Sequence, residues 1–299
     1  WHFFGYIFYF IILLFLIWAS LYGITASGSQ RWINLYFINL QPSELMKIAI
    51  ILCLAKFYHR IQLNNVNSFK NLLISLTILI LPIMLVISQP DLGTSILIAL
   101  SGLVVLWLVG LNIKYFLYSF LTLTISMPFI ISFLKPYQKL RILTFLNPDR
   151  DPLGAGYQII QSKIAVGSGG LFGKGFLKGT QSYLEFLPEK HTDFIFTLFS
   201  EEYGFIGSVA LLLLYVIIIY RVLKVGSISR SNFAKLYCYG FASAIFFYVT
   251  VNMSMVLGLL PIVGSPLPIM SYGGSSMLAT MLGFSIVMSA KINHKQLIG

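Results

Sequence analysis

The stretch that decides the fold is residues 194–220, FIFTLFSEEYGFIGSVALLLLYVIIIY. Residues 203–220 carry no charge, and their apolar side chains form a continuous run. A run of about 20 mostly apolar residues has the length of a membrane-spanning helix. A strand of a membrane barrel would instead alternate apolar and polar residues. This stretch therefore predicts a transmembrane helix.

The composition of the whole chain points the same way. Of its 299 residues, 58% are apolar and 10% are charged, and the mean hydropathy is +0.86. A soluble domain has about 45–50% apolar and about 25% charged residues. A soluble enzyme, a disordered chain and a disulfide-rich secreted domain are therefore excluded. Cys53 and Cys238 lie in apolar runs and are expected to be small buried residues without a redox or metal role.

Similar apolar runs recur along the chain and predict eight spans in all. They lie at residues 3–25, 42–58, 71–88, 92–110, 115–134, 194–220, 236–258 and 272–290. In lipid, only helices and closed barrels satisfy the backbone, and these continuous runs favour helices. We expect an all-α polytopic membrane protein, organised as a single integral membrane domain over residues 1–299.

The basic residues set the orientation of these spans. One alternate set of gaps between spans, together with the C-terminal tail, contains lysines and arginines but no acidic residue. These basic residues are Lys56, Arg60, Lys70, Lys114, Arg221, Lys224, Arg230, Lys235, Lys291 and Lys295. Because short loops rich in Lys and Arg face the cytoplasm, both termini are predicted to be cytoplasmic. Topology thus accounts for much of the net charge of +11, and no nucleic-acid partner is expected.

The longest gap, residues 135–193, is expected to form one extracytoplasmic loop of about 60 residues, a length typical of a functional segment. Residues 157–166 have apolar side chains at helical spacing and predict a helix lying on the outer membrane surface. The glycine-rich stretch at residues 167–175 follows. It forms either a flexible turn or a place where bare backbone amides, with Lys174 and Lys178, approach a phosphate.

Acidic residues near the predicted span ends are candidate functional groups, because charges within spans are costly. Glu44 and Lys47 lie three residues apart on one helix face and predict a structural ion pair, with a functional role as the alternative. Asp91 follows Pro90, as an acid at a helix start does, and a catalytic role is the alternative. Asp193 lies where the long loop enters a span. It either compensates the helix dipole or acts chemically.

Nine short motifs occur in order with consistent spacing. They are QRW (30–32), QPSE (41–44), QPDLGTS (89–95), DPLGAGY (151–157), QSKIA (161–165), GTQS (179–182), EFLPE (185–189), HTDF (191–194) and SYGGS (271–275). The ordered set resembles the SEDS family (shape, elongation, division and sporulation), from about residue 25 to the C-terminus.

The resemblance implies ten spans and a cytoplasmic N-terminus, whereas eight spans are predicted here. We expect the chain to lack the family's first two spans, in preference to a cleaved signal peptide. Losing two spans preserves the predicted orientation. The family motif from Asn252 to Ser275 is intact except at Ser265, where the family usually has an aliphatic residue. Little effect is expected from this difference.

The resemblance also implies a function, that of a peptidoglycan glycosyltransferase. Such an enzyme would polymerise lipid II at the outer face of the bacterial cytoplasmic membrane during cell elongation. The implied partners are lipid II, membrane lipid and a class B penicillin-binding protein that crosslinks the strands. The position of Asp193 matches the family's essential acid. We expect Asp193 to be the general base of an inverting attack on the anomeric carbon that carries the lipid pyrophosphate.

Other polar residues are candidate substrate contacts. The four that would contact the pyrophosphate are Arg31, Lys163, Lys174 and Lys190. Further candidates for substrate binding are Gln181, Ser182, Glu185 and Ser271. No cofactor is required by the sequence, although a divalent cation, Mg or Mn, could share the contact with the pyrophosphate. Two alternatives stay open, a lipid II flippase and a non-catalytic membrane scaffold for cell-wall enzymes.

Overall fold

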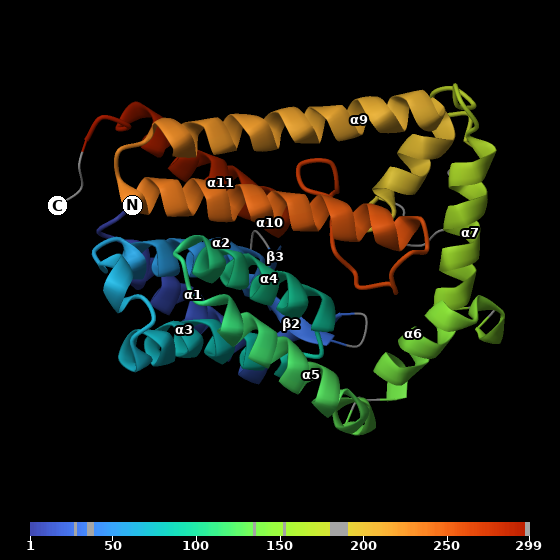
Figure 1. Ribbon diagram of the computed structural model, residues 1–299. Helices are drawn as coiled ribbons and strands as arrows, with labels where there is room; N and C mark the ends of the chain where they lie inside the picture. Colours follow the sequence, from blue (N-terminus) through green and yellow to red (C-terminus); the bar gives the residue numbers. More distant parts are fainter. Residues whose placement is uncertain (27–28, 35–38, 134–135, 152–153, 180–190, 297–299) are drawn as a thin grey trace. The chain divides into compact units, whose positions relative to one another are not determined.

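The computed structural model describes residues 1–26, 29–34, 39–133, 136–151, 154–179 and 191–296 (Figure 1). Its helices are α1 (Gly5–Tyr22), α2 (Pro42–Tyr58), α3 (Phe69–Ser88), α4 (Leu92–Leu108), α5 (Ile113–Phe133), α6 (Pro136–Leu146), α7 (Ala155–Ser168), α9 (Ile195–Ile228), α10 (Asn232–Val256) and α11 (Gly274–Ile292). Two short 3-10 helices lie at Leu63–Asn65 and Pro148–Arg150. The eight segments predicted as spans are helical, as α1–α5 and α9–α11.

Five helices in the described part of the chain are long and apolar enough to cross a membrane: α1, α3, α9, α10 and α11. Helix α4 is a shorter apolar helix. The predicted all-α polytopic fold is confirmed, and the chain is a multi-pass membrane protein. The helix expected at residues 157–166 is present as α7, and α6 is a second helix within the long gap.

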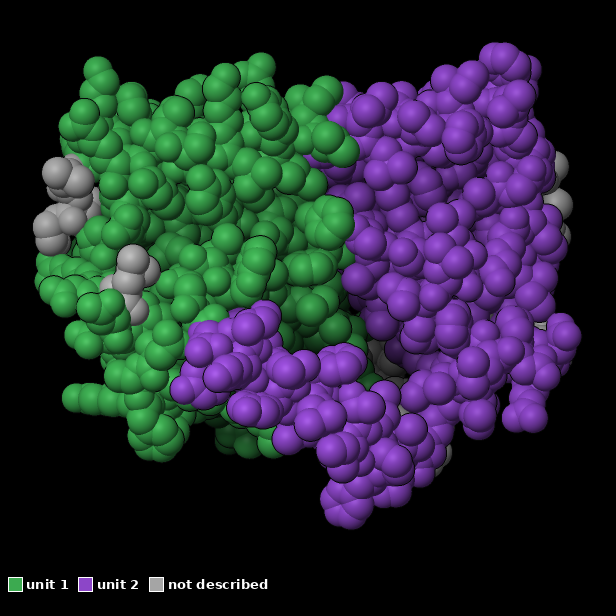
Figure 2. Space-filling view, viewed as in Figure 1, with its two compact units in different colours: residues 1–111, 216–248, 272–299 green, residues 112–215, 249–271 purple. Residues whose placement is uncertain are grey.

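The chain divides into two compact units, coloured separately in Figure 2. Unit 1 comprises residues 1–111, 216–248 and 272–299, and unit 2 comprises residues 112–215 and 249–271. Helices α9 and α10 each contribute one part to each unit. Of the described candidate residues, Arg31, Glu44 and Lys47 belong to unit 1, whereas Lys163, Lys174, Asp193 and Ser271 belong to unit 2.

Helix α2 forms the core of unit 1. It contacts α1, α3, α4 and α11, and every residue in it except Lys56 and Phe57 is buried. A helix that is apolar on all faces is expected to be enclosed in this way. Pro42 occupies its first turn, where the missing backbone N–H costs nothing.

Three short strands join α1 to α2: β1 (Ile24–Ala26), β2 (Ser29–Asn34) and β3 (Asn39–Leu40). They pair antiparallel in the order β1-β2-β3, with Ile24 opposite Trp32 and Ile33 opposite Leu40. This small sheet was not expected from the sequence. It carries Arg31 and leads directly into the first turn of α2.

Unit 2 is organised around the ends of α9 and α10. The hydroxyl of Ser162 on α7 donates to the carbonyl of Val256 at the end of α10, at 2.9 Å. Tyr215 on α9 donates from its hydroxyl to the carbonyl of Pro268, at 2.6 Å. These bonds tie residues 257–271, which connect α10 to α11, to the helices of the same unit.

Candidate active site

Asp193 occupies the turn that immediately precedes α9, as the sequence predicts for a carboxylate at a span entry. Its backbone is held by Asn252 on α10, a fully buried side chain. The Nδ2 group of Asn252 donates to the carbonyls of Asp193, at 2.9 Å, and of Ser265, at 2.7 Å. One amide group therefore fixes both the turn that bears the carboxylate and the connection that follows α10.

Ser271 holds the residue before Asp193. Its buried hydroxyl donates to the carbonyl of Thr192 at 2.6 Å and accepts from the backbone N–H of Leu267 at 2.7 Å. Sequence reasoning placed Ser271 among the substrate contacts. In the structure, its hydroxyl joins the turn at residues 192–193 to the turn at residues 267–271.

Two glycines lie beside the polar side chains of this region. Oδ2 of Asp193 is 3.4 Å from the place that a Cβ would occupy at Gly264, which has a φ of +69°. Lys163 is exposed on α7, and its Cε and Nζ fill the place of a Cβ at Gly258, which has a φ of +68°. A Cβ at Gly258 would therefore collide with the Lys163 side chain, whereas one at Gly264 would make an ordinary van der Waals contact with Asp193.

Lys174 forms an ion pair with Glu201. Its Nζ lies 2.7 Å from Oε1 of Glu201, whose side chain is completely buried. The backbone N–H groups of Lys174 and Gly175 donate to the carbonyls of Glu201 and Glu202, each at 3.0 Å. The amides proposed as phosphate donors at these two positions are thus bonded to α9.

Unit 1 contains a second buried ion pair. Nζ of Lys47 is 2.6 Å from Oε2 of Glu44, one turn away on α2, and 3.6 Å from the centroid of the Tyr248 ring. Both charged residues are about 5% exposed. An unpaired charge in a buried part of a membrane helix is costly. In this pair, each side chain neutralises the charge of the other.

Asp91 caps α4. Its Oδ1 accepts from the backbone N–H of Thr94 at 3.1 Å, which confirms the interpretation as a helix-start acid. Its Oδ2 accepts from Nη1 of Arg31 at 3.2 Å and from Nε2 of Gln41 at 3.3 Å. Arg31 was predicted to contact pyrophosphate, and in the structure its guanidinium joins β2 to the start of α4.

Gln181, Ser182, Glu185 and Lys190 lie outside the described residues, so their predicted roles stay predictions. Among the residues that are described, no three His, Cys, Asp or Glu side chains come together as a metal-holding group.

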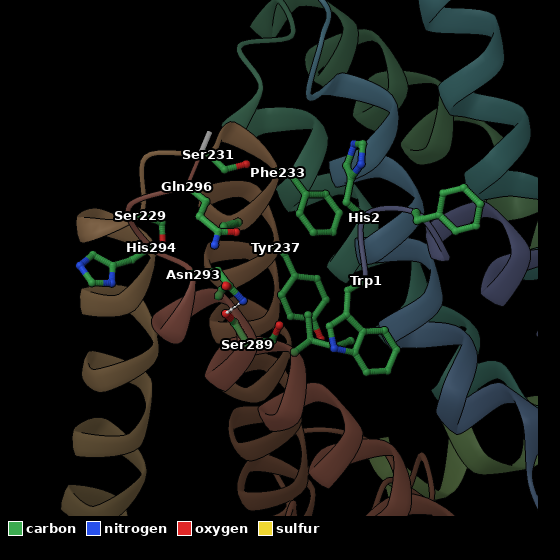
Figure 3. Close-up of a pocket in the computed structure, with 14 residues that line it drawn as sticks. Trp1, His2, Ser229, Ser231, Phe233, Tyr237, Ser289, Asn293, His294 and Gln296 are labelled. Atoms are coloured by element: carbon green, nitrogen blue, oxygen red, sulfur yellow. Dashed lines mark hydrogen bonds between the residues drawn. The ribbon is translucent and has the colours of Figure 1, made fainter. Parts of the chain in front are cut away.

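A cavity of about 340 Å³ lies in unit 1, between the N-terminal segment and the ends of α9, α10 and α11. Figure 3 shows Trp1, His2, Phe233 and Tyr237 among the residues that line it. A hydrogen bond of 3.0 Å from Nδ2 of Asn293 to the carbonyl of Ser289 links two of its lining residues. The described candidate residues are not among those that line it, so this cavity does not carry the predicted chemistry.

Sequence reasoning missed two buried side chains of unit 2, Asn252 and Glu201, as partners of candidate residues. A signal existed for Asn252, because it is the single carboxamide in the apolar run at residues 236–258. Glu201 also lies in an apolar run, but its partner Lys174 is 27 residues away. Only the fold brings this pair together.

The chain matches the family described as cell cycle protein, which covers FtsW, RodA and SpoVE, over residues 1–296. It is 47% identical to the peptidoglycan glycosyltransferase MrdB of Escherichia coli (strain K12) over 290 residues, which is 97% of this chain and 78% of MrdB. It is 37% identical to the stage V sporulation protein E of Bacillus subtilis over 269 residues, 89% of this chain and 72% of that protein.

Solved structures share the fold. A chain from a peptidoglycan synthase complex, in a study of the structural coordination of polymerization and crosslinking, has a TM-score of 0.83 and 32% identity, covering 99% of this chain and 82% of that one. The rod shape determining protein RodA of Thermus thermophilus has a TM-score of 0.71 and 26% identity, covering 99% and 80%. The chain belongs to the SEDS family, as the ordered motifs predict, and is a homologue of the peptidoglycan glycosyltransferase MrdB.

Proposed function

We propose that this chain is a peptidoglycan glycosyltransferase that polymerises lipid II at the outer face of the bacterial cytoplasmic membrane during cell elongation, with Asp193 as the general base. The observation that carries the proposal is the placement of Asp193 at the entry to α9. Two buried side chains hold the backbone there: Asn252 bonds to the carbonyl of Asp193, and Ser271 bonds to the carbonyl of Thr192 before it. Its relationship to MrdB supports the reaction class.

The reaction requires one base and a good leaving group. The Asp193 carboxylate takes the proton from the acceptor 4-hydroxyl as that oxygen bonds to the anomeric carbon of the donor. The bond from this carbon to the pyrophosphate breaks, and the lipid pyrophosphate leaves with the electron pair. Since attack and departure occur on opposite faces, the configuration inverts. A second carboxylate, which glycosidases use to protonate a poor leaving group, is not needed here.

Cations would stabilise the charge that develops on the pyrophosphate. Lys163 is suited to this role because its side chain is exposed and ends beside Gly258, in the same unit as Asp193. Lys190 and Arg31 remain candidates, as do Gln181, Ser182 and Glu185 for the rest of the substrate. A divalent cation, Mg or Mn, would need few protein ligands, since such ions are often held by one or two carboxylates together with substrate phosphates.

The proposed partner is a class B penicillin-binding protein that crosslinks the new strands. The fold similarity to a chain of a peptidoglycan synthase complex supports this assignment.

The test of the reaction class uses the purified chain in liposomes with labelled lipid II, with and without the candidate partner. The proposal predicts glycan strands longer than the disaccharide, together with release of the lipid pyrophosphate. Translocation of intact lipid II without any polymer would favour the flippase alternative. Neither product, in the presence of a partner that binds the chain, would favour the scaffold alternative.

A further inference from the structure

Helix α9 is broken near its start. Gly204 has a φ of 67° and a ψ of −162°, a conformation that interrupts the helix within Ile195–Ile228. A break leaves carbonyls before it and N–H groups after it without their helical partners. The short part of α9 before the break, residues 195–203 and here termed the half-helix, starts two residues after Asp193. Its orientation therefore bears directly on the position of that carboxylate.

The glycine-rich segment at residues 169–175, here termed the glycine clamp, supplies the missing partners. Before the break, the carbonyls of Glu201 and Glu202 accept from N–H groups of the clamp, as described above. After the break, the N–H groups of Phe205 and Ile206 donate to the carbonyls of Gly170 and Leu171, at 2.8 and 3.1 Å. The clamp follows α7 directly along the chain (Figure 1). It bonds to both halves of α9.

The clamp approaches α9 so closely that Gly173 and its counterpart Gly204 leave no room for a Cβ. Gly173 has a φ of +79°, and a Cβ there would collide with the carbonyl of Glu202. A Cβ at Gly204 would collide with the backbone N of Gly173. Backbone contact with the broken helix thus accounts for the glycine at position 173.

The ion pair between Lys174 and Glu201 lies at this junction. The carboxylate is completely buried, whereas Lys174 is 28% exposed. The second carboxylate oxygen, Oε2, lies 2.8 Å from the place of a Cβ at Gly179, the last described residue before residues 180–190. Glu201 thus contacts Gly179, which precedes residues 180–190 in the chain. The half-helix that carries Glu201 begins at Ile195, shortly after those residues.

We propose that the Lys174–Glu201 pair positions Asp193 for the reaction. This inference rests on the proposed function. Asn252 and Ser271 hold the half-helix at its start, and the glycine clamp with Lys174 holds it at its end. Removing one partner of a buried ion pair is strongly destabilising. Loss of Lys174 is therefore expected to displace the half-helix that carries Glu201. The role differs from the pyrophosphate contact that the sequence predicts for Lys174.

The test compares Lys174→Met with Lys174→Arg, and with Lys114→Met as a control for the loss of an exposed lysine elsewhere in unit 2. Each full chain is purified in detergent. Amide hydrogen exchange is measured over residues 191–206, and the polymerisation kcat and KM are measured with lipid II. The double variant Lys174→Met with Glu201→Gln removes both charges.

The proposal predicts faster exchange at residues 195–206 in Lys174→Met, while α10 keeps its protection. It also predicts that kcat falls about 100-fold, the effect of a displacement of about 1 Å in an active site, while KM stays within about twofold of its original value. Lys174→Arg retains both properties, and the double variant regains the exchange protection. Lys114→Met matches the unmodified chain.

Unchanged exchange in Lys174→Met would overturn the proposal. So would a rise in KM at constant kcat, because that result assigns Lys174 to substrate binding. If the unmodified chain forms no glycan, the proposed function fails by itself. The exchange comparison then still decides whether the pair holds the half-helix, since it needs no activity.

Discussion

At the level of single residues, the position of Asp193 depends on the buried polar groups that bond to the backbone of residues 192–193. A single Nδ2 group, that of Asn252, donates to the carbonyls of both Asp193 and Ser265. Asn252→Ala would leave both carbonyls without this donor. Leaving a buried polar group unsatisfied costs about 1–3 kcal/mol. We expect a stability loss of about 2 kcal/mol, seen as a lower thermal midpoint in detergent, and a reduced polymerisation rate.

Ser243→Ala is the matched control for that variant. Ser243 lies on the same helix, and its hydroxyl donates to the carbonyl of Tyr239 within one turn, at 2.9 Å. This variant should leave both stability and rate nearly unchanged. Equal effects of the two substitutions would mean that Asn252 contributes only as an ordinary polar residue of α10.

Substitution of Ser265 is predicted to raise the stability of the protein, whereas substitution of Asn252 lowers it. Its buried hydroxyl has no hydrogen-bond partner among the residues that the structure describes. Ser265→Ala removes that unsatisfied group and is expected to stabilise the protein by about 1 kcal/mol, measured as a higher thermal midpoint. Ser271→Ala should lower it, because that hydroxyl makes two hydrogen bonds. A destabilised Ser265→Ala would contradict the assignment of an unpartnered hydroxyl.

At the level of helices and strands, the break in α9 makes a testable demand on the residue at position 204. A φ of 67° with a ψ of −162° is essentially restricted to glycine and costs another residue about 1–3 kcal/mol. We therefore expect Gly204→Ala to lower the thermal midpoint and to raise amide exchange in the glycine clamp. Gly167→Ala, in α7 with open space around its Cα, should be neutral or stabilising. A stable Gly204→Ala would argue against the clamp.

The helices could be predicted from the sequence because the length and the apolar character of a span are visible in the run of residues itself. Residues 3–25 and 115–134, for example, correspond to α1 at Gly5–Tyr22 and α5 at Ile113–Phe133. The end of α9 was predicted at residue 220, whereas it extends to Ile228. Basic residues end an apolar run, but they do not end a helix.

The sheet and the helix break could not be predicted in the same way. Strand β1 pairs with β2, with Ile24 opposite Trp32, and no alternating apolar pattern marks these few residues. The break at Gly204 depends on hydrogen bonds from residues 170–175, a distant segment of the chain. Asp193 was predicted from motif resemblance and its place before a span, but its anchors Asn252 and Ser271 come from other parts of the chain.

At the scale of the whole molecule, the distribution of charge predicts the topology. The side that carries Lys224 and Lys291 should be cytoplasmic, and the side that carries His191 should face outward. Single cysteines at the exposed positions Lys295 and His191 test this with a membrane-impermeant maleimide on intact cells. The native Cys53 and Cys238 are buried, so little background labelling is expected. His191→Cys should react and Lys295→Cys should not. The reverse pattern would invert the orientation and remove Asp193 from the outer face.

The proposed role of Asp193 as the base for glycan polymerisation is tested by a comparison of rates. The initial rate of lipid II polymerisation is compared between the unmodified chain and Asp193→Asn, at equal amounts of folded protein judged by thermal midpoint. A positioned general base contributes about 10²–10⁴-fold to a rate. The account predicts a loss of that size in Asp193→Asn with an unchanged midpoint. Polymerisation at the full rate by Asp193→Asn would contradict it.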